Sequence, residues 1–235
     1  LIAIYVGAIW MTLGLYSELE KRGIDWKRSG MLSVISGILF GVGSYLAVTK
    51  LSLSPDLAHQ IVEPLMLSLK QIVPDQKFET QAIMMFMPGV LGSALVSSIA
   101  ASFVFESQIF QVFNLKREKL ASGLKWLEFR LPDMFIWLSL FAFLFSMVDT
   151  SIRLFEINIV QVIAINISII SVVAYFFQGI SVIEFATRIF RVGRISKFML
   201  YFLLITWALP LVTLLGLADY WVDFRRLLRK RIKVN

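Results

Sequence analysis

Four side-chain amides interrupt a long apolar stretch near residues 157–185, and they are the groups whose chemistry most needs a partner. These residues are Asn158, Gln161, Asn166 and Gln178. A polar group inside hydrocarbon costs free energy unless it is hydrogen-bonded, so each amide must bond a neighbouring helix or a polar ligand. Both alternatives are open, and the four amides are the candidate ligand-binding residues of the chain.

Two pairs of opposite charge are spaced one helical turn apart. Asp149 precedes Arg153 by four residues, and Glu184 precedes Arg188 by four. On a helix, this spacing lets the two side chains form an ion pair and neutralise each other near a membrane surface. We expect structural ion pairs. The alternative is a channel or a gradient-driven carrier, for which Asp149 and Glu184 are the acidic candidates.

Signatures of enzymes are absent from the sequence. The chain has one histidine, His59, and no cysteine, so thiolate chemistry and disulfides are excluded. Neither a zinc-binding HExxH motif nor a glycine-rich phosphate loop occurs. Ser93 has no histidine in an apolar segment that could activate it as a nucleophile. We therefore predict a protein that is not an enzyme, with no catalytic residue, no metal site and no cofactor.

The elements that position these groups are apolar segments of nearly membrane-spanning length. Hydrophobic residues make up 58% of the 235 residues, and charged residues only 17%. A helix that crosses about 30 Å of hydrocarbon needs about 20 apolar residues. Six runs qualify as candidates: Leu1–Tyr16, Gly30–Thr49, Gln81–Phe105, Met134–Val148, Ile157–Phe185 and Phe198–Leu217. The fold class predicted is all-α, a polytopic membrane bundle with about six transmembrane helices in one membrane domain, truncated at its N-terminus.

Small residues and one proline suggest how the second and third runs pack. Small side chains four residues apart let helices approach closely, and we expect this packing to be intramolecular. The sequence MPG at residues 87–89 is expected to kink or interrupt the third run. The small residues are Gly37 and Gly41 in the second run, and Ser93, Ser97 and Ala101 in the third.

Two further segments are predicted to be amphipathic helices at the membrane surface. One covers residues 54–74 and the other is a basic tail over residues 219–235. Asp219 and Asp223 in this tail are expected to pair with neighbouring arginines or to cap the helix end. The cations expected to contact the membrane surface are Arg225, Arg226, Arg229, Lys230, Arg231 and Lys233.

Charges between the runs conflict with six simple crossings. Four basic residues lie in residues 17–29, five in 106–133 and four in 186–197, which indicates that these connections are cytoplasmic. Strict alternation then puts the basic tail on the opposite side, against the positive-inside rule. We interpret this as a miscount: either the last run, with Pro210 at its middle, does not cross, or one basic connection misleads. Membrane topology also explains the net charge of +7 without a nucleic-acid partner.

Three C-terminal stretches carry a resemblance to a known family. They are WLEFRLPDMFIWL at residues 126–138, FFQGISVIEFATR at 176–188 and LLITWALPLVTLLGLADYWVDFRR at 203–226. This pattern resembles the YybS-like bacterial membrane proteins of the domain of unknown function 2232 family. The positions that match it are Gln178, Gly179, Pro210, Gly216, Asp219, Trp221, Asp223 and Arg225.

The resemblance implies a multi-pass protein of the bacterial cytoplasmic membrane, with further spans before the first run. The family is similar in general character to the substrate-binding membrane subunits of energy-coupling-factor transporters. It is also similar to membrane proteins of the rod-shape morphogenesis apparatus. We therefore expect a non-enzymatic binding subunit for a small solute or, as the alternative, a scaffold for a cell-envelope complex. The expected partners are the lipid bilayer and other membrane-protein subunits.

Overall fold

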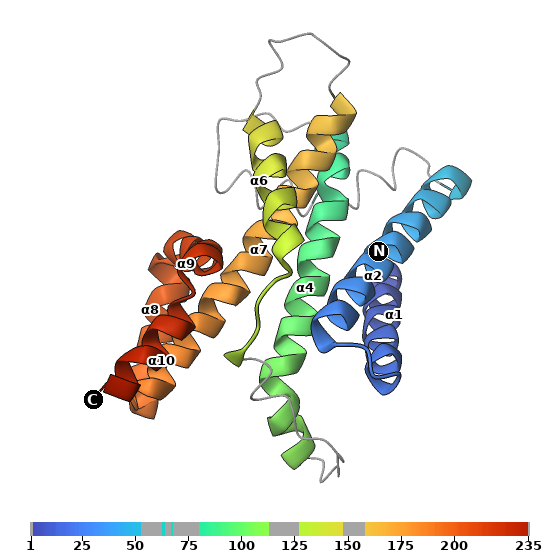
Figure 1. The fold of residues 1–235 in the computed structure, drawn as a ribbon. Coiled ribbons are helices and arrows are strands. Elements are labelled where there is room, and N and C mark those ends of the chain that lie inside the picture. Colours follow the sequence, from blue (N-terminus) through green and yellow to red (C-terminus); the bar gives the residue numbers. More distant parts are fainter. Residues whose placement is uncertain are drawn as a thin grey trace. The chain divides into compact units, whose positions relative to one another are not determined.

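The computed structural model describes residues 2–52, 63, 67, 80–112, 127–147 and 158–234, and all regular elements in these ranges are helices (Figure 1). The all-α prediction is therefore confirmed for these ranges. The expected amphipathic helix over residues 54–74 lies outside them, except for Glu63 and Leu67. The helices are α1 (Ile2–Lys21), α2 (Trp26–Ser52), α4 (Thr80–Val112), α6 (Asp133–Met147), α7 (Asn158–Ile189), α8 (Arg194–Trp207), α9 (Leu209–Val222) and α10 (Phe224–Val234).

The chain divides into two compact units. Unit 1 contains Leu1–Leu95 and Ala142–Ile169, and unit 2 contains Val96–Phe141 and Ile170–Asn235. The division runs through α4, α6 and α7, so each of these helices contributes to both units.

The number of membrane-spanning helices is smaller than the sequence predicts. Within the described residues, Met85–Ser102 and Val160–Ile189 are long and apolar enough to cross a membrane. A third span results only if Arg194–Leu204 and Leu209–Val222, which are bent by 99°, count as one. The expectation of about six spans is therefore wrong for these residues. It treated every apolar run as a span, whereas Asp133–Met147 has 15 residues, fewer than the roughly 20 that a crossing needs.

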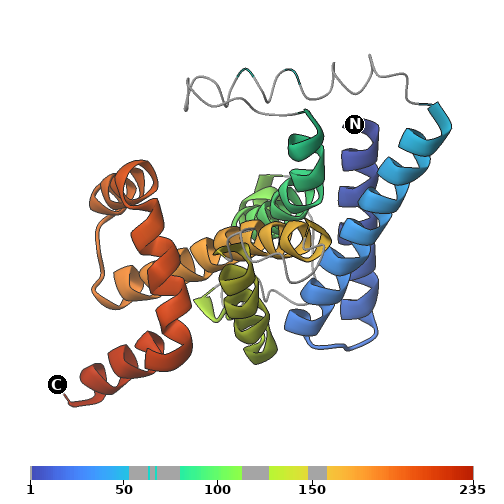
Figure 2. The same cartoon turned by 90° about the horizontal axis from the view of Figure 1, so that it is seen from above.

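In unit 1, α1 and α2 form an antiparallel hairpin, and the views from two directions show them side by side (Figures 1 and 2). Gly23 ends α1 with a φ of 79°, and the amide of Ile24 donates to the carbonyl of Leu19. This is the glycine-based helix stop called a Schellman motif. A Cβ on Gly37 would lie 1.9 Å from the hydroxyl oxygen of Thr12 and 3.1 Å from Leu95, which is too close for either neighbour. The small residue therefore serves intramolecular packing, as predicted.

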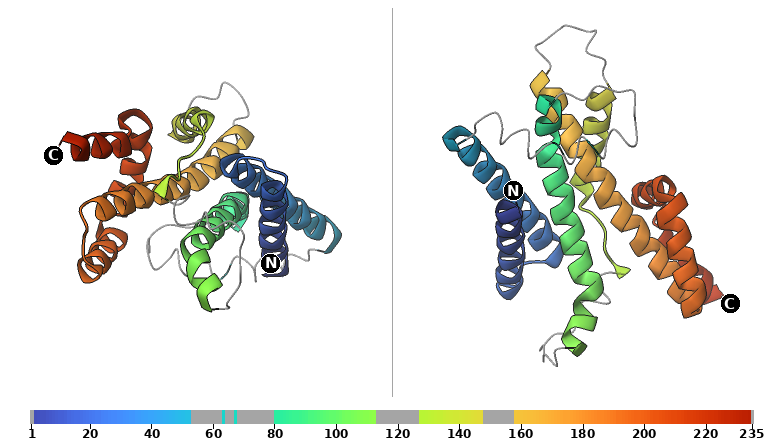
Figure 3. Two further views of the ribbon diagram at one scale, coloured as in Figure 1. Left: turned by 60° about the horizontal axis from the view of Figure 1, so that its bottom comes forward. Right: turned by 180° about the vertical axis from the view of Figure 1, so that it is seen from behind.

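In unit 2, α6 packs antiparallel to α7. The hydroxyl oxygens of Ser139 and Ser171 are 2.9 Å apart, and the rings of Phe135 and Tyr175 lie 5.9 Å apart between centroids. Lower residue numbers on α6 therefore pair with higher numbers on α7. This register brings the segment before α6, residues 127–132, beside the C-terminal half of α7, where α8, α9 and α10 also gather (Figure 3).

The last apolar run breaks at Ala208 into α8 and α9 instead of forming one helix. Pro210 stands in the first turn of α9, where helix N–H groups lack intrahelical partners and the missing donor of proline costs nothing. Inside a continuous helix, the same proline would remove a hydrogen bond and clash with the preceding turn. Both ends of the broken run lie beside one stretch of α7. Lys197 pairs with Glu184 at the start, and Arg229 lies over the Phe185 ring after the end.

Candidate functional site

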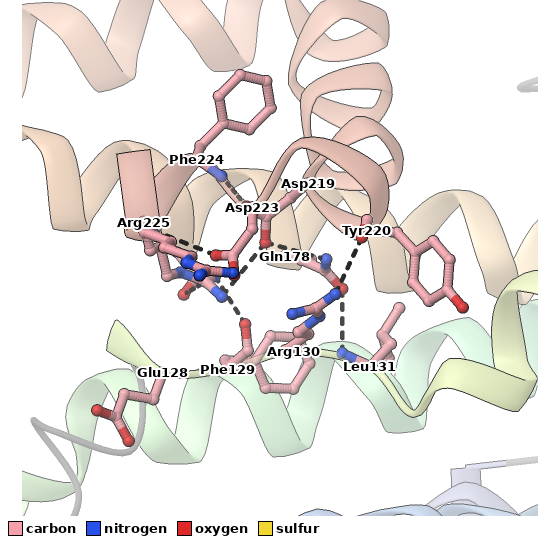
Figure 4. Close-up of polar contacts among 12 residues, drawn as sticks. Glu128, Phe129, Arg130, Leu131, Gln178, Asp219, Tyr220, Asp223, Phe224 and Arg225 are labelled. Carbon is pink, nitrogen blue, oxygen red and sulfur yellow. Dashed lines mark hydrogen bonds and ion pairs between the residues drawn. The ribbon is translucent and has the colours of Figure 1, made fainter. Parts of the chain in front are cut away.

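A group of buried and half-buried polar residues, which we call the C-terminal polar cluster, joins four segments of unit 2. Its side chains are Arg130 before α6, Gln178 and Ser181 on α7, Asp219 on α9 and Arg225 on α10. Figure 4 shows the side chains of Gln178, Asp219 and Arg225 converging beside the backbone of residues 129–131. Gln178, Asp219 and Arg225 all belong to the pattern that carries the family resemblance.

Asp219 lies at the centre of the cluster and is 1% exposed. Its carboxylate oxygen Oδ2 is 3.3 Å from Nη1 of Arg225 and accepts a hydrogen bond of 3.4 Å from the Gln178 amide. The other oxygen accepts the backbone N–H of Phe224 at 3.1 Å. Because the carboxylate has a cation and two hydrogen-bond donors, its burial is compensated.

Arg225 is 7% exposed, so it does not contact the membrane surface as the sequence suggested. Its guanidinium donates to the carbonyl of Phe129 at 2.8 Å and to the hydroxyl of Ser181 at 3.0 Å. Burial lowers the pKa of the Arg225 guanidinium, and the Asp219 carboxylate opposes this effect. Arginine stays charged in proteins, so Arg225 acts as an internal cation that ties α10 to α7 and to the segment before α6.

Two further hydrogen bonds attach the segment before α6 to α7 and α9. The backbone N–H of Leu131 donates to Oε1 of Gln178 at 3.0 Å. Arg130 donates to the carbonyl of Tyr220 at 3.0 Å, and its guanidinium carbon lies 5.7 Å from the centroid of the Tyr220 ring. Gln178 therefore bonds protein groups on both of its sides. It links α7 to α9 and to residue 131. Of the two alternatives for this amide, a neighbouring helix or a polar ligand, the structure therefore shows the bond to a neighbouring helix.

Two glycines of the family-like pattern let α9 cross α7 at close range. A Cβ placed on Gly179 would lie 2.0 Å from the carbonyl oxygen of Val212. A Cβ placed on Gly216 would lie 2.0 Å from the carbonyl oxygen of Tyr175. Neither contact is sterically possible, because backbone atoms cannot move away as a flexible side chain can. Both positions therefore require glycine, and the crossing holds Asp219 against Gln178.

Asp223 makes the turn between α9 and α10. It adopts a left-handed conformation with a φ of 47°, which aspartate tolerates better than most residues. Its carboxylate accepts the N–H of Arg226 at 3.3 Å and so caps α10. The basic tail expected over residues 219–235 is therefore divided, since residues 219–222 belong to α9. Both predicted roles of the acids occur: Asp219 pairs with Arg225, and Asp223 caps a helix.

Other cations of the tail lie outside the cluster. Arg226 and Lys230 are exposed. Arg229 is exposed as well, with its guanidinium 3.6 Å from Glu128 and 5.2 Å from the Phe185 ring centroid. The side chains of Arg231 and Lys233 lie outside the described residues. Membrane contact by these five cations stays a prediction.

Asn166, another candidate ligand residue, bonds helix α4 inside unit 1. Its Oδ1 accepts the N–H of Gly89 at 2.5 Å, and its Nδ2 donates to the carbonyl of Met85 at 2.8 Å. These two backbone groups are four residues apart, so they would bond each other in a regular helix. The amide of Asn166 bridges these two groups beside Pro88, and α4 continues through the MPG sequence without interruption.

The other candidate residues predicted from the sequence lie on α7 or outside the described residues. Gln161 is half-buried on α7, and the side chain of Asn158 lies outside the described residues, as do Asp149 and Arg153. The predicted pair of Glu184 and Arg188 is confirmed, with 3.0 Å between their charged atoms.

Glu184 also has two partners that the sequence did not reveal. Its carboxylate lies 2.6 Å from Nζ of Lys197 and accepts the Tyr201 hydroxyl at 2.5 Å. Two cations and a hydroxyl group of the protein therefore bind this carboxylate. The contacts with Lys197 and Tyr201 hold α8 against α7.

Sequence reasoning missed Arg130 and Ser181 as members of the C-terminal polar cluster. Arg130 stands in the WLEFRLP stretch that carries the family resemblance, and its proximity to a proline before an apolar run was the available signal. Ser181 follows Gln178 by three residues on α7 and so shares its face. Among the described residues, no group of three or more histidine, cysteine, aspartate or glutamate side chains could hold a metal ion. The bonds between Gln178, Asp219 and Arg225 join α7, α9 and α10, so the cluster acts as a clamp between these helices.

Comparison with known proteins places these features in a family. Residues 1–220 match the family described as predicted membrane protein, DUF2232. Comparison with curated proteins and with solved structures gave no match. The matched range includes Arg130, Gln178 and Asp219 of the cluster, while Arg225 lies five residues beyond it. The family resemblance read from the C-terminal pattern is thus confirmed, and the chain belongs to the DUF2232 family of predicted membrane proteins.

Proposed function

We propose that the protein is a non-enzymatic, multi-pass membrane scaffold that docks a second membrane protein on the outer face of its C-terminal helices. One observation carries this proposal. Trp221 is 61% exposed, although Asp219 and Arg225 of the same short pattern are buried and paired with each other. The pattern thus uses its charged residues for internal structure and presents its largest aromatic residue outward.

The exposed residues that follow Trp221 in the sequence have the composition of a protein interface. They are the apolar residues Val222 and Leu227 and the cations Arg226 and Lys230. Tryptophan and arginine dominate the binding energy of many interfaces, with polar groups around them that exclude water. A partner that fits this surface presents an apolar helix face flanked by acidic side chains. The clamp beneath fixes the surface before binding, which lowers the entropy lost on association.

The geometry gives less support to the binding of a small polar solute. Such a site needs polar groups that converge on a cavity and are not already bonded. Asn166 and Gln178, two of the four candidate amides, form their hydrogen bonds with backbone and side chains of the chain itself. Gln161 is the half-buried candidate through which a solute site is best tested.

Site-specific photo-crosslinking in native membranes tests the scaffold. A photoreactive amino acid replaces Trp221 in one variant and Trp207, which is 85% exposed, in the control. We expect one defined protein adduct at position 221 and lipid adducts at 207. The same partner should co-purify with the unaltered protein and with W207A but not with W221A. Lipid adducts alone at both positions would show that Trp221 only anchors the protein at the membrane surface.

A thermal-stability screen separates the solute-binding alternative. The purified protein is heated with a panel of vitamins and metabolites, and the unfolding midpoint is compared with that of Q161A. A ligand that raises the midpoint of the unaltered protein but not that of Q161A would favour a solute-binding subunit over a scaffold.

A further inference from the structure

Independently of the scaffold, we propose that a groove between α7, α8 and α9 binds one acyl chain of an anionic phospholipid. The phosphate of this lipid is held by Arg191 and Arg194 at the turn between α7 and α8. Three features of unit 2 support this assignment: the chemistry of the groove lining, the charge at its end, and the position of that charge in the chain.

The groove is apolar and large enough for part of a lipid. Its volume is about 520 Å³, within the range of about 300–1,000 Å³ typical of ligand sites. Thr187 contributes the hydroxyl group among the lining side chains, and this hydroxyl donates to the carbonyl of Glu184 at 2.9 Å. A polar ligand would therefore lose its hydration without gaining hydrogen bonds. The lining residues are Ile183, Ala186, Thr187, Phe190, Val192, Leu200, Leu204, Ala208, Leu211, Val212 and Leu215.

Two arginines stand where the groove meets the turn. Arg191 lies in sequence between Phe190 and Val192, which both line the groove, and Arg194 is the first residue of α8. Both side chains are exposed. In the part of the chain that the structure describes, neither forms an ion pair, whereas Arg188 and Lys197 are both paired with Glu184. The turn therefore carries two positive charges that a phosphate group would neutralise.

These two features together specify an amphiphile with a negative head. A free phosphate ion would pair with the arginines and leave the groove empty of acyl chain, while a neutral lipid would fill the groove without matching the charge. Basic pockets between helices at the cytoplasmic side bind anionic lipid head groups in general. The turn belongs to residues 186–197, a basic connection that the positive-inside rule assigns to the cytoplasmic side. Anionic lipids are available on that side.

Binding of a fluorescent phosphatidylglycerol to the purified protein in detergent tests the charge. The variant R191Q/R194Q is compared with R226Q/K230Q, which removes two exposed cations from α10 and leaves the groove turn intact. We expect R191Q/R194Q to weaken binding ~10-fold, because each cation near a lipid phosphate contributes to the attraction. The control should change binding less than twofold. Equal weakening by both variants would overturn the proposal, since it would show attraction by net charge alone.

The groove is tested by A186F, which places a phenyl ring among the lining residues. We expect weaker binding of phosphatidylglycerol to this variant at an unchanged thermal unfolding midpoint. Unchanged lipid affinity of a folded A186F would show that the acyl chain lies elsewhere and would overturn the proposal.

Competition on the unaltered protein keeps the test valid if a variant fails to fold. Lysophosphatidylglycerol should displace the fluorescent lipid, whereas inorganic phosphate and glycerol 3-phosphate should not, and phosphatidylcholine should compete at least ~10-fold less well. Displacement by inorganic phosphate as effective as that by the lysolipid would identify a simple anion site. Equal competition by phosphatidylcholine would remove the role of the arginines. Either result contradicts an anionic-lipid site.

Discussion

Two regions of the chain bury polar side chains between helices, and they do so with different chemistry. In unit 1, Asn166 is a neutral amide that bonds backbone groups of α4 on both sides of Pro88. In unit 2, the C-terminal polar cluster uses an ionised pair, Asp219 and Arg225, whose partners include side chains from α7. One region restores a helix that a proline has weakened, and the other fastens separate helices together.

The difference follows from the cost of desolvation. An amide carries no net charge, so it can sit in the middle of a membrane-spanning segment if its donors and acceptor are bonded. An ion pair costs several kcal/mol per ion to bury and needs hydrogen bonds beyond the pair itself. Asp219 obtains such a bond from the N–H of Phe224 at the start of α10, where helix N–H groups lack intrahelical partners. Arg225 obtains its bonds from the Phe129 carbonyl before α6 and from the Ser181 hydroxyl on α7. Asn166 therefore supports a single helix, whereas the pair of Asp219 and Arg225 joins several helices.

The largest effect is predicted for D219A. This change leaves Arg225 buried without its carboxylate, and removing one partner of a buried pair costs about 3–5 kcal/mol of unfolding free energy. Equilibrium unfolding in detergent, followed by circular dichroism, measures it. The double variant D219L/R225M serves as the control, because it removes both charges and should recover most of the loss. A loss below about 1 kcal/mol for D219A would mean that water reaches Arg225.

G216A is predicted to have the next largest effect. The added methyl group meets the backbone carbonyl of Tyr175, so α9 must move away from α7 and the cost is about 3 kcal/mol. The matched control is G14A in α1, where a Cβ meets nothing within 4 Å. Alanine there should stabilise the helix by about 0.5–1 kcal/mol. Opposite signs for the two substitutions, in the same unfolding assay, are the expected outcome.

N166A tests the role of the neutral Asn166 amide in unit 1. The change leaves the Gly89 N–H and the Met85 carbonyl without their bonds to the amide, at a cost of about 1–3 kcal/mol. Q161A on the same helix is the control and should cost less, since the residues that the structure describes give Gln161 no hydrogen bond of the Asn166 kind. Hydrogen–deuterium exchange should show faster exchange at residues 85–93 in N166A. Unchanged exchange there would contradict the role of Asn166 in α4.

The smallest energetic effect, within about 0.5 kcal/mol, is predicted for two cysteine substitutions that locate the charged region in the membrane. The chain has no cysteine, so S196C and K230C each provide one label site. Both ends of the broken run lie beside residues 181–185 of α7, so we expect both cysteines to react with an impermeant maleimide from the same, cytoplasmic side. Labelling from opposite sides would show that α8 and α9 cross the membrane as one bent span.

Features that depend on near neighbours in the chain could be predicted from the sequence. Helices, the pair of Glu184 and Arg188, and the capping role of Asp223 all follow from spacings of three or four residues. The interpretation that the run around Pro210 does not cross cleanly rested on the basic residues counted between the runs, together with the proline at its middle.

Features that join distant segments could not be predicted in the same way. Nothing in the spacing of Asn166 reveals that its partners are Met85 and Gly89, about 80 residues earlier in the chain. Likewise, Arg225 looks like its exposed neighbours Arg226 and Lys230 until the position of Phe129 is known. The number of spans was overestimated because hydrophobicity alone does not show where a helix breaks or how long it is.

The return of the broken run to its starting point on α7 has a consequence for biosynthesis. Residues 194–230 assemble against a helix that precedes them in the chain, since Lys197 near the start of this region pairs with Glu184 and Arg229 near its end lies over the Phe185 ring. On the topology that the cysteine labelling tests, no basic residue of this region has to be carried through the insertion machinery. Formation of the C-terminal assembly becomes a docking step that follows insertion of α7, and the pairing of Arg225 with Asp219 marks its completion.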